Sequence, residues 1–203
     1  MFIESVEKVT KIKYKVVTEN GLLYLYTGDL RRYRIKQGTE LSDDAYEALM
    51  KETLIPRCRR KALDILTRTD RTEKELREKL ARAGFSPELV NDAISYVNSY
   101  HYLDDERVAK NYIGFKGTKK SKRELSMELT RKGIERDTAE RLIEENSDED
   151  SAIESAIRKR IGSKEKLSDD EIRKLSGYLY RHGFEADLIK DKLYRLREEN
   201  NSL

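Results

Sequence analysis

The sequence is short of the residues that build most small catalytic or disulfide-stabilised proteins. Its 203 residues include no tryptophan, one cysteine, two prolines and two histidines. A single cysteine, Cys58, excludes an intrachain disulfide and suits a reducing compartment. Cys58 stands at helical spacing from Ala62 with no base nearby in sequence, so we interpret it as a buried thiol and not as a reactive one.

Long apolar runs are also missing. No segment approaches the roughly 18 apolar residues that a membrane span needs, and residues 1–8 lack the apolar stretch of a signal peptide. We therefore expect a cytoplasmic protein. Only 37% of the residues are hydrophobic and 40% are charged, which disfavours one thick core and suits an elongated array of amphipathic helices.

The sequence does contain a helix with both ends encoded. Thr72 can cap its N-terminus through the hydroxyl, and Glu75 can reach back to the N–H of the cap. Gly84 supplies the left-handed residue just past the C-terminus. Leu80 and Phe85 then stand at the two positions that make the apolar contact of a Schellman motif.

The same pattern occurs twice more along the chain. Ser121 leads to Gly133, and Ser168 leads to Gly183, each serine being followed three residues later by a glutamate. The three glycines lie 49 and 50 residues apart, although the third copy has three extra residues between cap and glycine. This spacing predicts a tandem repeat of three-helix units, with the middle helix of each ending at the glycine.

The first 56 residues predict a different structure. Alternating residues at 12–16, the turn at Asn20-Gly21 and a returning strand at 22–26 predict a hairpin, and Tyr33 and Ile35 predict a third short strand. Ser42 can cap a helix that Pro56 closes. We therefore expect a mainly α protein: a β-meander plus helix at 1–56, then helical repeats at 57–103, 104–147 and 148–203.

Catalytic patterns are weak. Asp104-Asp105 is the most enzyme-like feature, but no third acid or histidine accompanies it at ligand spacing, so we interpret Asp104 as a helix cap. His101 and His182 have no cysteine or histidine at zinc spacing. The repeat glycines follow helices, unlike those of a phosphate-binding loop. We expect no enzymatic activity, no cofactor and no metal.

Charge is distributed unevenly along the chain. Residues 57–132 hold 19 basic and 12 acidic side chains, whereas residues 133–203 hold 14 and 18. Two clusters are candidate partner-binding residues: Arg57, Arg59, Arg60 and Lys61, and then Lys116, Lys119, Lys120, Lys122 and Arg123. Two interpretations stay open, a solvated face or contact with phosphates or an acidic protein groove. The tyrosines between the clusters could stack on bases, although packing between repeats is the favoured role; they are Tyr96, Tyr100, Tyr102 and Tyr112.

Four motifs occur in a fixed order: Leu66–Thr69 at the end of a basic helix, Glu75-Leu76 with Leu80 and Gly84, Tyr102–Asp105 with Ala109 and Tyr112, and Glu124-Leu125 with Leu129, Gly133 and Ile134. In this combination they resemble the RecX family of bacterial recombination regulators, over about residues 57–200. The third repeat departs from the pattern in two ways: its middle helix is longer, and the segment that leads into it is acidic (Asp148-Glu149-Asp150).

The resemblance implies a curved helical array and a monomer without catalytic activity. It implies binding in the groove of the RecA recombinase–DNA filament, across neighbouring protomers, with inhibition of strand exchange, ATP turnover and repressor cleavage. Direct contact with DNA is left open. One alternative is a helical-repeat transcription factor, but the predicted third helices carry many carboxylates, which would repel phosphates. Another is a scaffold that binds proteins only.

Overall fold

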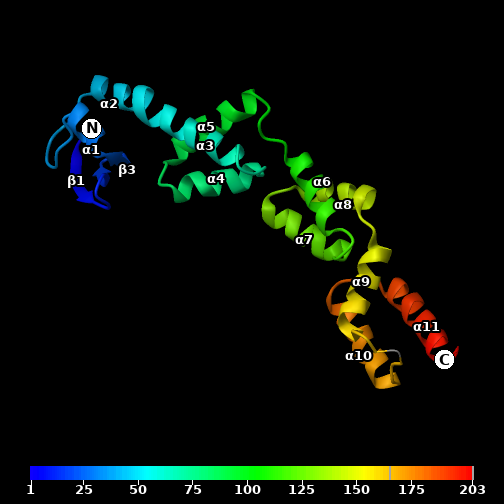
Figure 1. The fold of residues 1–203 in the computed structure, drawn as a ribbon. Coiled ribbons are helices and arrows are strands. Elements are labelled where there is room, and N and C mark those ends of the chain that lie inside the picture. Colours follow the sequence, from blue (N-terminus) through cyan, green and yellow to red (C-terminus); the bar gives the residue numbers. More distant parts are fainter. Residues whose placement is uncertain (165, 203) are drawn as a thin grey trace. The chain divides into compact units, whose positions relative to one another are not determined.

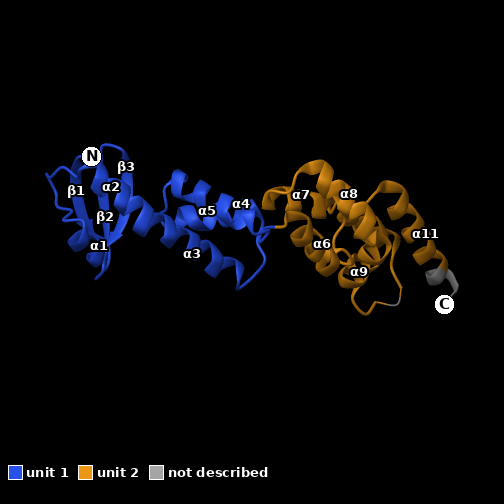
Figure 2. Cartoon of the chain, turned by 90° about the horizontal axis from the view of Figure 1, so that it is seen from above, with its two compact units in different colours: residues 1–103 blue, residues 104–203 orange. Residues whose placement is uncertain are grey.

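The computed structural model describes residues 1–164 and 166–202, with side chains described through residue 198. The chain forms two compact units, residues 1–103 and 104–203 (Figure 2). The described residues are mostly helical, with one small antiparallel sheet near the N-terminus (Figure 1). The predicted fold class, a mainly α chain of three-helix repeats preceded by a small β-meander, is confirmed.

Unit 1 begins with a three-stranded antiparallel sheet in the order β1-β2-β3. The strands are β1 (Ile3–Lys8), β2 (Lys13–Thr18) and β3 (Gly21–Tyr26). The predicted hairpin is confirmed, because Thr18 pairs with Gly21 across a tight turn in which Gly21 has a φ of +120°. Glycine adopts this backbone conformation at little cost.

The predicted third strand at Tyr33 and Ile35 is wrong. Residues Thr27–Arg32 form the short helix α1, in which Asp29 accepts the N–H of Tyr26 at 2.7 Å. The third strand of the sheet is instead β1, at the start of the chain, and its register with β2 shifts between Ile3 and Ser5. Such a bulge adds one residue to the strand, so the apolar residues Ile3 and Val6 lose the period of two that identifies a strand in a sequence.

One continuous helical segment follows. Ser42 caps α2 (Asp43–Leu49) by accepting the N–H of Ala45, as predicted. The chain then passes through the π-helical turn η1 (Met50–Leu54) into α3 (Ile55–Leu66). The prediction that Pro56 closes the helix is wrong. Pro56 is the second residue of α3, directly after a wide turn that has already displaced the regular hydrogen-bond ladder, so its missing N–H interrupts little.

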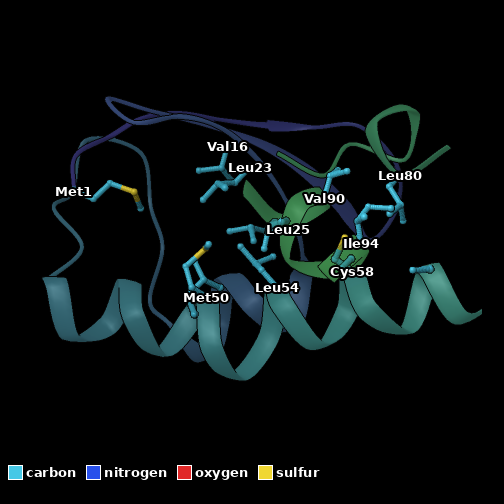
Figure 3. Packing of buried hydrophobic residues seen from close by; sticks show 14 of the residues in the cluster. Met1, Val16, Leu23, Leu25, Met50, Leu54, Cys58, Leu80, Val90 and Ile94 are labelled. Carbon is cyan, nitrogen blue, oxygen red and sulfur yellow. The ribbon is translucent and has the colours of Figure 1, made fainter. Parts of the chain in front are cut away.

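This helical segment joins the sheet to the first repeat. Figure 3 shows Met50 and Leu54 directed from it toward Leu25 of the sheet, and Cys58, further along the helix, beside Ile94. The same buried cluster runs on to the two further helices of the first repeat, α4 (Glu73–Arg82) and α5 (Pro87–Ser99). The N-terminal segment and the first repeat thus share one core, and a separate domain at 1–56 stays a prediction.

The end of α4 has the predicted Schellman geometry. The N–H of Phe85 donates to the carbonyl of Leu80 at 3.3 Å, and the N–H of Gly84 donates to that of Ala81 at 2.9 Å. Gly84 has a φ of +93°. At the start of α4, Thr72 and Glu75 form the reciprocal capping box. Both ends of the helix are confirmed.

Unit 2 contains the second and third repeats, each around its own buried cluster. The second repeat is α6 (Asp105–Lys116), α7 (Lys122–Lys132) and α8 (Arg136–Asn146). The third is α9 (Glu149–Ile161), α10 (Asp169–Arg181) and α11 (Ala186–Ser202). Ser121 and Ser168 cap α7 and α10, and Gly133 and Gly183 follow with φ values of +100° and +84°. The predicted caps of both repeats are confirmed.

The second and third repeats are joined at these caps. The Ser121 hydroxyl accepts the N–H of Glu124 at 3.1 Å and donates to the carbonyl of His182 at 2.6 Å. Nδ1 of His182 lies 2.7 Å from Oε1 of Glu124, and the side chain of Arg123 packs against Gly183. At Ser121 the glutamate therefore contacts the next repeat, whereas Glu171 at Ser168 completes its own capping box.

Candidate partner-binding surfaces

Half of the first basic cluster is held inside unit 1. Arg57 makes a bidentate ion pair with Asp29, with both N–O distances at 2.8 Å. Arg59 does the same with Asp92, at 2.6 and 2.9 Å, and lies over the ring of Tyr96. The hydrogen bond that Arg59 donates to the carboxylate of Asp92 raises the pKa of Arg59. These two guanidiniums stabilise the unit and are poorly placed for a partner.

The other half of the cluster is exposed. Arg60 and Lys61 have no ion pair among the described residues. Lys61 also lines a hollow of about 490 Å³ formed by α3, the following turn and α4. This basic hollow has one carboxylate, Asp64, against five cationic side chains: Lys61, Arg68, Arg71, Lys79 and Arg82. Arg71 and Arg82 pair with Glu75 and Glu78, while Arg68 and Lys79 have no ion pair in the described part of the chain.

Sequence reasoning missed the basic hollow because its cations do not form a run. Lys61 and Arg68 stand seven residues apart, two turns along one face, and Lys79 and Arg82 are one turn apart on the next helix. That spacing was the available signal. The opposing walls only become one surface when α3 and α4 fold beside each other, so counting neighbours along the sequence undervalued these residues.

The second basic cluster is divided in the same way. Lys120 pairs with Glu128, and Lys122 pairs with Glu144 at 2.6 Å. Burial raises the pKa of Glu128, but hydrogen bonds from Lys120 and Tyr112 outweigh burial and lower it. Tyr112 packs against the buried cluster of its own repeat and donates its hydroxyl to Glu128. Burial and this hydrogen bond raise the pKa of Tyr112 far above its usual value.

The remaining cations of the second cluster surround an exposed aromatic ring. Phe115 is 67% exposed, and the ammonium groups of Lys116 and Lys119 lie 5.0 and 5.2 Å from its centroid. Arg123 is exposed beyond the contact of its stem with Gly183. An exposed aromatic side chain flanked by cations is a typical contact element for an anionic partner.

The other tyrosines between the clusters lie at the surface of unit 1. Tyr96 and Tyr100 have ring centroids 5.1 Å apart, and Tyr100 stacks on Tyr102 at 5.7 Å. Tyr100 and Tyr102 are about half exposed. Tyr100 and Tyr102 thus pack on one another at the surface, whereas Tyr96 also packs against the core of unit 1.

The residues considered for catalysis have local structural roles. Asp104 caps α6 by accepting the N–H of Arg107 at 2.8 Å, as predicted. Cys58 is buried, and desolvation, with the nearby Asp92 carboxylate, raises the pKa of its thiol to about 12. Among the described residues, no three His, Cys, Asp or Glu side chains gather as metal ligands would.

None of the helices in the part of the chain described here combines the length and apolar character that a bilayer crossing requires.

Comparison with known proteins gives a consistent match. The model of the RecX first three-helix domain matches residues 58–96, that of the second matches 104–143, and that of the third matches 148–193. Regulatory protein RecX of Caldanaerobacter subterraneus subsp. tengcongensis is 31% identical over 185 residues, covering 89% of this chain and 92% of its own. Regulatory protein RecX of Bacillus subtilis is 27% identical, covering 97% and 77%.

Solved structures show the same fold. A crystal structure of regulatory protein RecX aligns with a TM-score of 0.62 and 20% identity, covering 94% of this chain and 98% of its own. A crystal structure of RecX from Lactobacillus salivarius aligns with a TM-score of 0.58 and 20% identity, covering 74% and 98%.

Proposed function

The chain belongs to the RecX family of regulatory proteins, and from this premise we propose that it is a negative regulator of homologous recombination and the SOS response. It binds the RecA recombinase–DNA filament as a cytoplasmic monomer. Binding inhibits the strand-exchange, ATPase and coprotease activities of the filament. The regulator acts only by binding to the filament and catalyses no reaction of its own.

The observation that carries the proposal is the basic hollow of unit 1. Five cations face one carboxylate there, and Arg68 and Lys79 have no ion pair among the described residues. Concentrated positive charge in a concave surface attracts a polyanion or an acidic protein groove and raises the rate of encounter. A filament of protein on DNA offers both kinds of surface.

The second repeat offers a further contact of the same sign. Lys116, Lys119 and Arg123 remain available there, whereas Lys120 and Lys122 are committed to carboxylates of their own repeat. We therefore propose Arg60, Lys61, Lys116, Lys119 and Arg123 as partner-binding residues, and we add Arg68 and Lys79 from the basic hollow.

A second candidate function is direct binding of DNA as a transcription factor. The basic hollow favours it, since guanidinium and ammonium groups also bind phosphates. The third helices disfavour it, because α8 carries Asp137, Glu140, Glu144 and Glu145 where a recognition helix would need groups that read base edges.

Charge reversal of the basic hollow tests the proposal. The variant Arg68→Glu/Lys79→Glu changes the exposed Arg68 and the half-buried Lys79, and Arg158→Glu/Lys159→Glu in α9 is the control with the same change of net charge. Both are measured as inhibitors of the DNA-dependent ATPase of RecA. Because an exposed ionic contact contributes about 0.2–1 kcal/mol, we expect the hollow variant to need roughly tenfold more protein for half inhibition.

The control variant should inhibit within about twofold of the wild type, since only general electrostatic attraction changes. Equal inhibition by all three proteins would refute the assignment of the basic hollow. Loss of binding to naked DNA in parallel with the loss of inhibition would favour the transcription-factor alternative.

Lys116→Glu/Lys119→Glu tests the second repeat better than reversal of Lys120 or Lys122, because a glutamate at those two positions would face Glu128 or Glu144.

A further inference from the structure

A groove between the middle and last helices of the third repeat has an aromatic side chain on each wall. It has a volume of about 530 Å³, and Ile172, Ile189 and Leu193 form its apolar floor. Tyr180 comes from α10 and Tyr194 from α11. These rings are 66% and 61% exposed, and neither hydroxyl makes a hydrogen bond within the described residues.

The second repeat has a groove at the same place but without aromatic walls. Its volume is about 620 Å³, and it lies between α7 and α8. Counted from the repeat glycines, Gly133 and Gly183, the position of Tyr180 is occupied by Thr130 and that of Tyr194 by Glu144.

The first repeat carries small residues at both positions. Counted from Gly84, Ala81 corresponds to Tyr180 and Ser95 corresponds to Tyr194. Three-helix units of the same design thus fold without an aromatic residue on either wall. The two tyrosines of the third repeat are not required by its fold, and their exposure leaves apolar surface in water that a partner could cover.

The rim of this groove has three cations, Arg173, Lys190 and Arg197, against one carboxylate, Asp169, although its repeat as a whole is not basic. Lys190 has no ion pair among the described residues, and Glu140 stands at its position in the second repeat. Arg173 and Arg197 also line the groove, each paired with one aspartate, at 2.9 and 3.3 Å. An occupant with apolar side chains for the floor and a carboxylate for Lys190 would complement it.

We infer that this groove, which we call the tyrosine groove, binds an acidic and partly apolar segment of the recombinase protein. This inference rests on the proposed function. Tyrosine and arginine are the side chains that most often dominate protein–protein interfaces, because they bury a large area at low entropic cost and keep a polar end. A nucleic acid fits less well, since residues 133–203 hold 18 acidic against 14 basic side chains and would repel a continuous row of phosphates.

The double variant Tyr180→Ala/Tyr194→Ala tests the inference. Both side chains are exposed, so we expect helical content and melting temperature close to those of the wild type. Affinity for RecA filaments, measured by titration of the full-length chain, should fall at least about tenfold if the two rings act as interface anchors. Lys190→Glu should weaken binding in the same direction, because it reverses the charge that faces the occupant.

The matched control is Tyr100→Ala/Tyr102→Ala, which removes two exposed tyrosines from unit 1. It should change affinity for filaments less than about threefold. Wild-type affinity in the Tyr180/Tyr194 variant, with filament binding by the wild type intact, would overturn the inference and leave the proposed function standing. An equal loss of affinity for a naked single-stranded oligonucleotide would also overturn it, because the occupant would then be nucleic acid. If the wild type does not bind filaments, the proposed function and the inference both fail.

Discussion

At the scale of single residues, Gly84 meets two independent demands. Its φ of +93° is strained for any residue with a side chain, and an added Cβ would lie 2.4 Å from Cδ2 of Tyr24 in the sheet. The glycine therefore ends α4 and also lets the end of this helix approach the sheet closely. The nearby Lys13 ammonium donates to the carbonyl of Ala83 at 3.2 Å, which also holds the end of α4 against the sheet.

We expect Gly84→Ala to lower the free energy of unfolding by about 2 kcal/mol or more, since backbone strain and a steric clash add together. The measurement is urea denaturation followed by circular dichroism. Gly114→Ala is the control, because Gly114 lies inside α6 with nothing within 4 Å of an added Cβ. That change should stabilise the protein by about 0.5–1 kcal/mol. Unchanged stability in Gly84→Ala would contradict this role of the glycine.

Local residue chemistry was predictable from the sequence. Each predicted helix cap is in place, because a cap depends on residues within one turn of each other. The functions of individual arginines were less predictable. Asp29 and Arg57 are 28 residues apart and Arg59 and Asp92 are 33 apart, so only the folded chain shows that these two cations are already paired.

At the scale of elements, the two adjacent aspartates at the start of α6, Asp104 and Asp105, have different roles. Only Asp104 has the non-helical backbone of an N-cap, and its carboxylate accepts the N–H of Arg107. We expect Asp104→Ala to cost about 1 kcal/mol of stability and Asp105→Ala to cost less, because the latter loses the favourable helix dipole interaction but keeps the cap.

Thermal denaturation of the two variants provides the comparison. A larger loss for Asp105→Ala would refute the assignment of the cap. Stoichiometric binding of a divalent metal by the wild type, abolished in Asp105→Asn, would refute the assignment of this pair to a structural role.

The joint between the second and third repeats depends on Ser121. This hydroxyl is buried and serves two backbone groups, whereas the Ser168 hydroxyl lies at the surface and serves its own helix. We expect Ser121→Ala to cost about 2–3 kcal/mol, because it leaves the carbonyl of His182 without its donor as well as removing the cap. Ser168→Ala should cost about 1 kcal/mol.

Both costs can be measured from urea unfolding midpoints at constant slope. Equal costs for the two serines would show that the contact with His182 contributes nothing to the joint.

The elements that the sequence failed to predict are those set by longer-range structure. Strand β1 has only Ile3 and Val6 as apolar residues and contains a bulge, so pairing with β2 and not local pattern makes it a strand. The helix through Pro56 continues because its apolar residues are buried along one face, Met50 and Leu54 toward the sheet and Cys58 beside Ile94 of the first repeat. Burial of this face outweighs the local preference of proline for a helix start.

At the scale of the whole molecule, the sequence predicted where positive charge gathers but not which cations are available. The net charge of residues 57–132 already indicated the basic half of the chain. The basic hollow and the tyrosine groove required the fold, because each is formed by side chains from two helices. Binding of a charged filament through such surfaces should weaken as salt is added.

Co-sedimentation with RecA filaments tests the central claim most directly. The wild-type chain is centrifuged with filaments assembled on single-stranded DNA, with naked DNA as the control, at low and at raised salt. We predict that it sediments with filaments at low salt, does so less as salt is raised, and stays in the supernatant with naked DNA at the same concentration. The Arg68→Glu/Lys79→Glu variant should sediment less than Arg158→Glu/Lys159→Glu. A wild-type chain that stays in the supernatant with filaments, or that sediments equally with naked DNA, would contradict the proposal that it regulates the recombinase by binding the filament.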